Sequence, residues 1–147
     1  MRPYRTVLTL LAFLFLLRVL GQALVALAGV TWLPAMPEWY SGLLPYPLLL
    51  PTQIVILAIQ TKISLDFFRG RGFFVVPRPR VGRILLGGSL LYFGAMVARY
   101  VLTMTWYPER RWLGTGTIPI VFHWILAAYL FTLARFHRAP ARAARPE

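Results

Sequence analysis

Cysteine is absent from this 147-residue chain, and Asp and Glu together number only four. The missing thiols exclude disulfides, iron–sulfur clusters and thiolate metal sites. The few acids form no carboxylate pair, and neither HExxH nor another His/acid metal motif occurs. No acid lies well inside an apolar run, where proton-coupled transporters commonly place one. We therefore expect no metal, no cofactor and no catalytic residue.

Histidine is nearly as rare, with His123 and His137 as the two residues of this type. Both fall on the same predicted helix, about 21 Å apart at the rise per residue of an α-helix. Because a bis-histidine haem needs ligands from two facing helices, one copy of the chain cannot hold it. A histidine–methionine haem, or a haem shared between two copies, is left as an alternative.

Apolar residues, by contrast, make up 59% of the chain, while charged residues make up 14%. Soluble domains are closer to half apolar and a quarter charged. A mean hydropathy of +0.64 excludes a water-soluble globule, and 16 Lys and Arg residues give a net charge of +12. These values indicate an integral membrane protein that is also strongly basic.

Four apolar runs are long enough to cross a hydrocarbon core, which takes about 20 helical residues. Helices are expected because backbone polar groups in lipid must bond within their own segment, and no alternating strand pattern is present. The fold prediction is all-α, a polytopic bundle of four transmembrane helices that forms one domain over residues 1–139. A disordered cytoplasmic tail is predicted at 140–147. The predicted spans are residues 6–30, 44–65, 84–105 and 117–135.

Basic residues set the orientation, because they gather on the cytoplasmic side of membrane proteins. If the spans alternate, most Lys and Arg residues lie on the side of both termini. We predict cytoplasmic termini in the inner (plasma) membrane of a bacterium. The first span resembles a secretory signal, but its length and the interrupting Arg18 favour an uncleaved anchor. An aromatic belt is predicted on the outer side, with Trp32, Trp39, Tyr40, Tyr46, Trp106, Tyr107 and Trp112.

Polar side chains inside the spans point to a binding site. Measured from the midpoint of each span, Gln22, Gln53, Arg99 and His123 fall roughly 3–6 Å toward the outer side, with Arg18 slightly deeper. An arginine inside the membrane is costly, and no acid within a span neutralises these two. We therefore predict an outer-half pocket that binds a carboxylate or phosphate. Its expected lining is Arg18, Gln22, Gln53, Tyr92, Arg99, Tyr100 and His123.

The functional hypothesis is a membrane binding or accessory protein whose pocket receives an anionic amphiphile, such as a lipid, a fatty acid or an isoprenoid phosphate. The alternative is that the same polar residues form a buried hydrogen-bonded network that only holds the helices together. Two other functions stay open, an oligomeric channel or transporter for a small anion and a membrane anchor subunit of a redox or lipid-modifying enzyme. The small-xxx-small pair Gly94 and Ala98 favours packing within the bundle, with a homo-oligomer or a membrane protein partner as the alternative.

The second connection between spans combines aromatic and basic residues, with two phenylalanine pairs flanking an Arg-Gly-Arg-Gly core. The pattern resembles RNA-binding Arg-Gly segments. A loop tethered between two spans favours the anionic inner leaflet instead, so we expect membrane lipids and no nucleic acid as its partner. The residues predicted at the membrane surface are Phe67, Phe68, Arg69, Arg71, Phe73 and Phe74.

Overall fold

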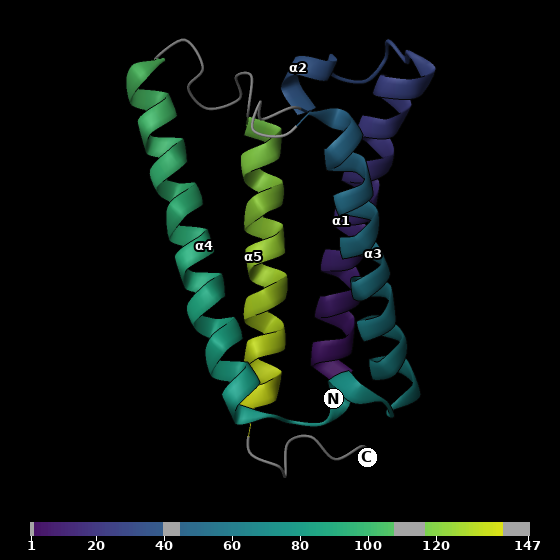
Figure 1. Cartoon of the computed structure of the whole chain (residues 1–147), viewed down its shortest axis with the longest axis vertical. Coiled ribbons are helices and arrows are strands. Elements are labelled where there is room, and N and C mark those ends of the chain that lie inside the picture. The colour runs from purple at the N-terminus through teal and green to yellow at the C-terminus, as the bar shows by residue number, and fades with distance from the viewer. Residues whose placement is uncertain (1, 40–44, 108–116, 140–147) are drawn as a thin grey trace.

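The computed structural model describes residues 2–39, 45–107 and 117–139 (Figure 1), and the tail predicted at 140–147 lies outside them. Every regular element in these ranges is helical, which confirms the all-α prediction. The elements are α1 (Arg2–Ala28), α2 (Met36–Trp39), α3 (Tyr46–Arg69), the 3-10 turn η1 (Phe73–Val75), α4 (Pro79–Trp106) and α5 (Thr117–Arg138).

The four long helices α1, α3, α4 and α5 are each long and apolar enough to cross a membrane. They continue beyond the predicted spans on the side of the termini. The helix α3 ends where Gly70 adopts a left-handed conformation with φ of 62°. The helix α4 begins with Pro79 in its first turn, where the missing N–H costs no hydrogen bond.

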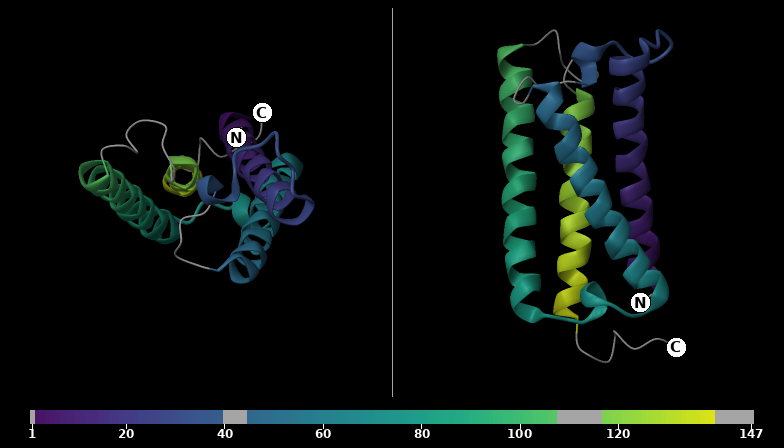
Figure 2. Two further views of the ribbon diagram at one scale, coloured as in Figure 1. Left: turned by 90° about the horizontal axis from the view of Figure 1, so that it is seen from above. Right: turned by 45° about the vertical axis from the view of Figure 1, so that its right-hand side comes forward.

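The long helices form a curved row in the order α3, α1, α5 and α4 (Figure 2). The helix α1 packs on α3 and α5, while α4 packs mainly on α5, so α3 and α4 occupy the two flanks. The short α2 lies over α1 and α5 at one end, which we name the α2 end. Both chain termini and η1 lie at the opposite end, which we name the terminal end (Figure 1).

The main apolar core lies toward the terminal end. Phe136 of α5 is 1% exposed and meets the rings of Tyr4 and Phe67 edge to face, with centroids 5.5 and 4.7 Å away. The outer faces of the helices are apolar as well, since Leu27, Ile84 and Leu91 are each more than 70% exposed. An exposed apolar surface of this extent is typical of a membrane-facing protein. The model therefore indicates a multi-pass membrane protein.

The glycines of α4 differ in what surrounds them. A Cβ atom built on Gly82 would lie 2.7 Å from Arg138 Cγ and 3.0 Å from the carbonyl oxygen of Ala134, so Gly82 allows α4 to approach α5. Gly87, Gly88 and Gly94 meet nothing within 4 Å in the described part of the chain. The small residues around Gly94 therefore do not serve close packing between the described helices of one copy.

Candidate functional site

Arg18 and Gln22 lie one turn apart on the buried face of α1, near the α2 end. Arg18 is 7% exposed and Gln22 is fully buried. Nη2 of Arg18 and Nε2 of Gln22 both donate to the carbonyl oxygen of Trp39, at 3.2 and 3.4 Å. A main-chain carbonyl from the connection between α1 and α3 thus serves as the shared acceptor for two polar side chains of α1.

Trp39 reaches this position because α2 folds back over α1. A Cβ atom at Gly21 would lie 2.7 Å from Cη2 of the Trp39 ring, so only glycine leaves room for the ring in its present place. The indole nitrogen donates to the carbonyl oxygen of Pro34 at 2.8 Å, which fixes the ring from the other side. Gly21 next to Gln22 on α1 therefore positions the carbonyl that accepts from Arg18.

The helix α3 contributes Gln53 and Tyr46 to the same region. Nε2 of Gln53 donates to Oε1 of Gln22 at 3.1 Å, and Gln53 is 3% exposed. Oε1 of Gln53 and the hydroxyl of Tyr46 are buried without a hydrogen-bond partner among the described residues. The Tyr46 hydroxyl lies within electrostatic range of Arg18. Arg18 is therefore surrounded by polar groups from α1, α2 and α3.

The helices α4 and α5 form the other half of the region. The hydroxyl of Tyr92 makes a hydrogen bond with Nδ1 of His123, and the two rings meet edge to face at 5.6 Å. Tyr100 contacts the ring of Trp124 at 5.9 Å. Nε1 of Trp124 is buried without a partner in the described ranges. Tyr92 of α4 therefore holds the side chain of His123 on the neighbouring helix α5.

The two halves are linked electrostatically. Arg18 of α1 and Arg99 of α4 both lie close enough to interact with the ring of His123 on α5. His123 of α5 thus lies within electrostatic range of one arginine from α1 and one from α4. The ion pair formed between described residues, Lys62 with Asp66, lies at the terminal end, and no carboxylate in the described ranges forms an ion pair with Arg18.

The structure brings five of the seven predicted pocket residues into two hydrogen-bonded groups, while Tyr100 packs on Trp124 and Arg99 is in neither group. Arg18, Gln22 and Gln53 share one hydrogen-bonded chain, and Tyr92 is paired with His123. Whether these residues bind a ligand stays a prediction. Trp39 and Tyr46, predicted to be belt aromatics, also belong to the site. Gly21, beside Gln22, indicates close approach of another group to α1, but the sequence does not identify that group as the Trp39 ring.

The residues predicted at the membrane surface lie around η1 at the terminal end. Arg69, Arg71, Phe68 and Phe73 are exposed. The guanidinium of Arg5 lies 5.0 Å from the centre of the Phe68 ring. Phe74 is half-buried, whereas Phe67 is 3% exposed and packs in the core instead.

No group of three or more potential metal-ligating side chains occurs in the described part of the chain. The chain matches no protein-family model, no curated protein and no solved structure. The arrangement of side chains therefore supplies the basis for a functional proposal.

Proposed function

We propose that the chain is an integral inner-membrane binding or accessory protein that receives the head group of an anionic amphiphile at its α2 end. Arg18 carries this proposal, because its guanidinium is buried, forms no ion pair with a carboxylate in the described ranges and lies within electrostatic range of His123 on α5. Guanidinium groups recognise carboxylate and phosphate oxygens through charge-assisted hydrogen bonds. A lipid, a fatty acid or an isoprenoid phosphate supplies such a group together with an apolar tail.

The charge distribution supports an orientation with the α2 end outside the cytoplasm. The terminal end carries a large excess of basic side chains, whereas Arg18 and Arg99 lie within long helices. Basic residues flanking membrane spans favour the cytoplasmic side. The basic residues of the terminal end are Arg2, Arg5, Lys62, Arg69, Arg71, Arg78, Arg80, Arg83, Arg135 and Arg138.

The same distribution supports contact between the terminal end and anionic lipids of the inner leaflet. Each basic residue near such a surface contributes about 1 kcal/mol of attraction. Phe68 and Phe73 are 56% and 59% exposed there, and both are available for insertion among the head groups. We propose that this surface holds the protein against the inner leaflet while the α2 end binds its ligand.

Replacing Arg18 distinguishes a ligand-binding role from a role that only stabilises the packing of the helices. A guanidinium carries five N–H donors, and the Trp39 carbonyl engages one of its nitrogens. An anion adjacent to Arg18 gains hydrogen bonds to a charged donor, which are about twice as strong as neutral ones. A helix-locking role alone predicts loss of stability when Arg18 is replaced, with no change in bound lipid.

The test is native mass spectrometry of the purified protein with added oleate and farnesyl phosphate. We expect at least one probe to bind the wild-type chain at one per protomer. Arg18→Leu is expected to weaken that binding by about ten- to hundredfold, since a hydrogen bond to a charged group contributes about 1.5–3 kcal/mol. Arg83→Leu removes one exposed basic residue of the terminal end and is the matched control, which should still bind one probe per protomer at the α2 end.

Two outcomes contradict the proposal. The first is that neither probe binds the wild-type protein at a defined stoichiometry. The second is that Arg18→Leu lowers the unfolding temperature while leaving the bound probe unchanged, which assigns Arg18 to helix packing alone.

A further inference from the structure

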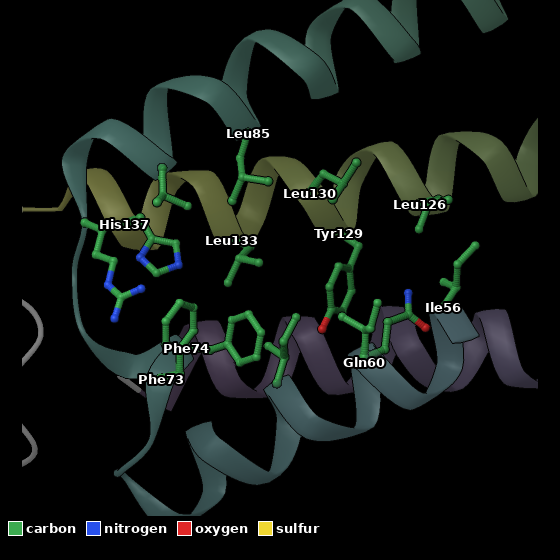
Figure 3. A pocket seen from close by; sticks show the side chains of 14 residues that line it. Ile56, Gln60, Phe73, Phe74, Leu85, Leu126, Tyr129, Leu130, Leu133 and His137 are labelled. Carbon is green, nitrogen blue, oxygen red and sulfur yellow. The ribbon is translucent and has the colours of Figure 1, made fainter. Parts of the chain in front are cut away.

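An apolar cavity of about 360 Å³ lies in the terminal half of the molecule, away from Arg18 (Figure 3). It forms because α3 and α4 pack on different neighbours and leave a space before α5. Its walls come from these three helices and from η1. Figure 3 shows Phe73 and His137 at one end of the cavity, with Ile56 and Leu126 at the other.

The surface that an occupant of this cavity meets is entirely apolar. Ile63 of α3, Leu85 of α4 and Leu130 of α5 contribute to the lining. Gln60 and Tyr129 border the cavity as well, but the nitrogen and oxygen atoms of their side chains are buried away from it. A polar head group placed inside would lose its hydrogen bonds to water and gain none in return. The lining therefore suits a hydrocarbon chain.

The cavity opens toward the side of the bundle. Ile59 of α3 and Val81 of α4 both line it and are 49% and 37% exposed, so its walls continue onto the outer faces of these helices. Both helices are long and apolar enough to cross a membrane. A lipid chain therefore reaches the cavity from the bilayer without passing through water.

The dimensions of the cavity match one acyl chain. Along α5, its lining extends from Leu126 to His137, which is about 16 Å at the rise per residue of an α-helix. One leaflet takes half of a hydrocarbon core about 30 Å thick, or about 15 Å. At about 30 Å³ for a group the size of a water molecule, the cavity holds about twelve methylene groups. Its length is thus that of one leaflet, and its volume suits most of one chain.

A cationic side chain lies at the terminal end of the cavity. Arg78 lines the cavity there, and its guanidinium lies 3.7 Å from the centre of the Phe73 ring. Within the described ranges Arg78 forms no ion pair. The exposed Arg80 and Arg83 follow it in the first turns of α4. Because guanidinium groups bind phosphate, and basic sites between helix ends bind anionic lipid head groups, this end of the cavity suits a lipid phosphate.

We infer that the cavity holds one acyl chain of an anionic phospholipid whose phosphate lies at Arg78. The inference rests on the proposed contact between the terminal end and anionic lipids, and it adds a defined site for one lipid per protomer. It is independent of the anion site at the α2 end. Attraction by surface charge alone predicts binding that depends on the number of basic residues and is insensitive to the cavity.

The experiment is native mass spectrometry of the full chain, purified in detergent and titrated with three lipids. Dioleoylphosphatidylglycerol has an anionic head group and long chains. Dioleoylphosphatidylcholine keeps the chains but has no net charge, and dihexanoylphosphatidylglycerol keeps the anionic head group but has short chains. We expect the first lipid to bind saturably at one per protomer. Its affinity should exceed that of either other lipid by about tenfold or more, because each of them lacks one of the two contacts.

Two arginine variants separate the cavity site from surface charge. Arg78→Leu is expected to weaken the binding of dioleoylphosphatidylglycerol by about tenfold, the loss that corresponds to one hydrogen bond to a charged group. Arg80→Leu removes an exposed charge two residues away, outside the cavity lining, and is the matched control. It should retain the wild-type affinity. Arg18→Leu removes the anion site alone and should also bind this lipid as the wild type does.

Two tryptophan variants test whether the chain lies in the cavity. Leu130→Trp fills the space from α5, and Val81→Trp fills it from its exposed edge on α4. Both are expected to abolish binding at one lipid per protomer. Leu91→Trp adds the same side chain to the exposed surface of α4, outside the cavity lining, and is their matched control. Unfolding temperatures identify a variant that fails to fold, and the lipid series and arginine variants give a result without altering the cavity.

Each contrary result has a distinct meaning. Equal affinity for phosphatidylglycerol and phosphatidylcholine overturns both this inference and the proposed contact with anionic lipids. Equal losses in Arg78→Leu and Arg80→Leu, or wild-type binding by folded tryptophan variants, overturn the cavity site and leave surface charge as the cause of binding. A dimer that carries no lipid places a second copy of the chain at the opening and overturns the inference as well. Loss of binding in Arg18→Leu alone would assign the lipid to the α2 end.

Discussion

At the scale of single residues, Gly21 controls the contact that holds Arg18. Replacement by alanine places a methyl group 2.7 Å from Cη2 of Trp39, which forces the ring to move. The Trp39 carbonyl then shifts away from Arg18 and Gln22. We expect Gly21→Ala to lower the stability by about 1–3 kcal/mol, the usual cost of overpacking. Thermal unfolding in detergent, followed by tryptophan fluorescence, measures the change.

The matched control for this prediction is Gly88→Ala on α4. No described atom lies within 4 Å of a Cβ built there, and Gly88 lies inside a helix. Alanine is favoured over glycine in a helix interior by about 0.5–1 kcal/mol. Gly88→Ala should therefore unfold at the same or a slightly higher temperature. An equal loss of stability in both variants would show that the Trp39 contact is not the cause.

The pair formed by Tyr92 and His123 is a second contact at this scale. Tyr92→Phe removes the hydroxyl that bonds to Nδ1 of His123, while the edge-to-face ring contact remains. We expect a loss of about 0.5–1.5 kcal/mol, the net contribution of one hydrogen bond. A double-mutant cycle with His123→Phe isolates the coupling between the two residues. Additive losses in that cycle would contradict a direct interaction in the folded protein.

At the scale of elements, Asp66 holds the connection between α3 and η1. Its carboxylate accepts from Nζ of Lys62 and, at 3.4 Å, from the main-chain N–H of Phe74. A Cβ at Gly72 would lie 2.4 Å from the Asp66 carboxyl carbon, so the turn closes directly over this side chain. One side chain therefore joins the end of α3 to the start of η1.

We expect Asp66→Ala to release this turn, because the N–H of Phe74 loses its acceptor. Arg69 and Arg71 then become better trypsin sites, and cleavage in the turn should be several times faster than in the wild type. Limited trypsin digestion followed by mass spectrometry measures the rate. Lys62→Ala is the control, since it removes the ion pair but keeps the contact to Phe74, and should accelerate cleavage less. Equal rates in Asp66→Ala and the wild type would contradict the role of Asp66.

The elements show how far apolar runs predict a fold. The run that predicted a span over residues 84–105 lies within α4, Pro79–Trp106, because helices are the spanning structure that satisfies its own backbone. The short α2 was not predicted. Its position depends on the contact between the Trp39 ring and Gly21, eighteen residues earlier in the chain. The local sequence around either residue does not predict that contact.

At the scale of the whole molecule, depth along the spans predicted part of the candidate site. The rise per residue put Gln22 and Gln53 at one level, and their side chains are hydrogen-bonded. The cavity bordered by Gln60 and Tyr129 could not be predicted in this way. It arises because α3 and α4 pack on different neighbours and leave a space before α5, and sequence periodicity does not determine which helices are adjacent.

Orientation is the property of the whole molecule that decides on which side of the membrane the proposed anion site lies. Because the chain has no cysteine, a single introduced cysteine reports one position without background. Trp32, near the α2 end, and Arg71, at the terminal end, are both exposed. If the basic terminal end is cytoplasmic, Trp32→Cys reacts in intact bacterial cells with a maleimide that cannot cross the inner membrane. Arg71→Cys then reacts only after the cells are lysed. The reverse pattern would place the anion site on the cytoplasmic side, and labelling of both positions in intact cells would contradict a fixed four-span orientation.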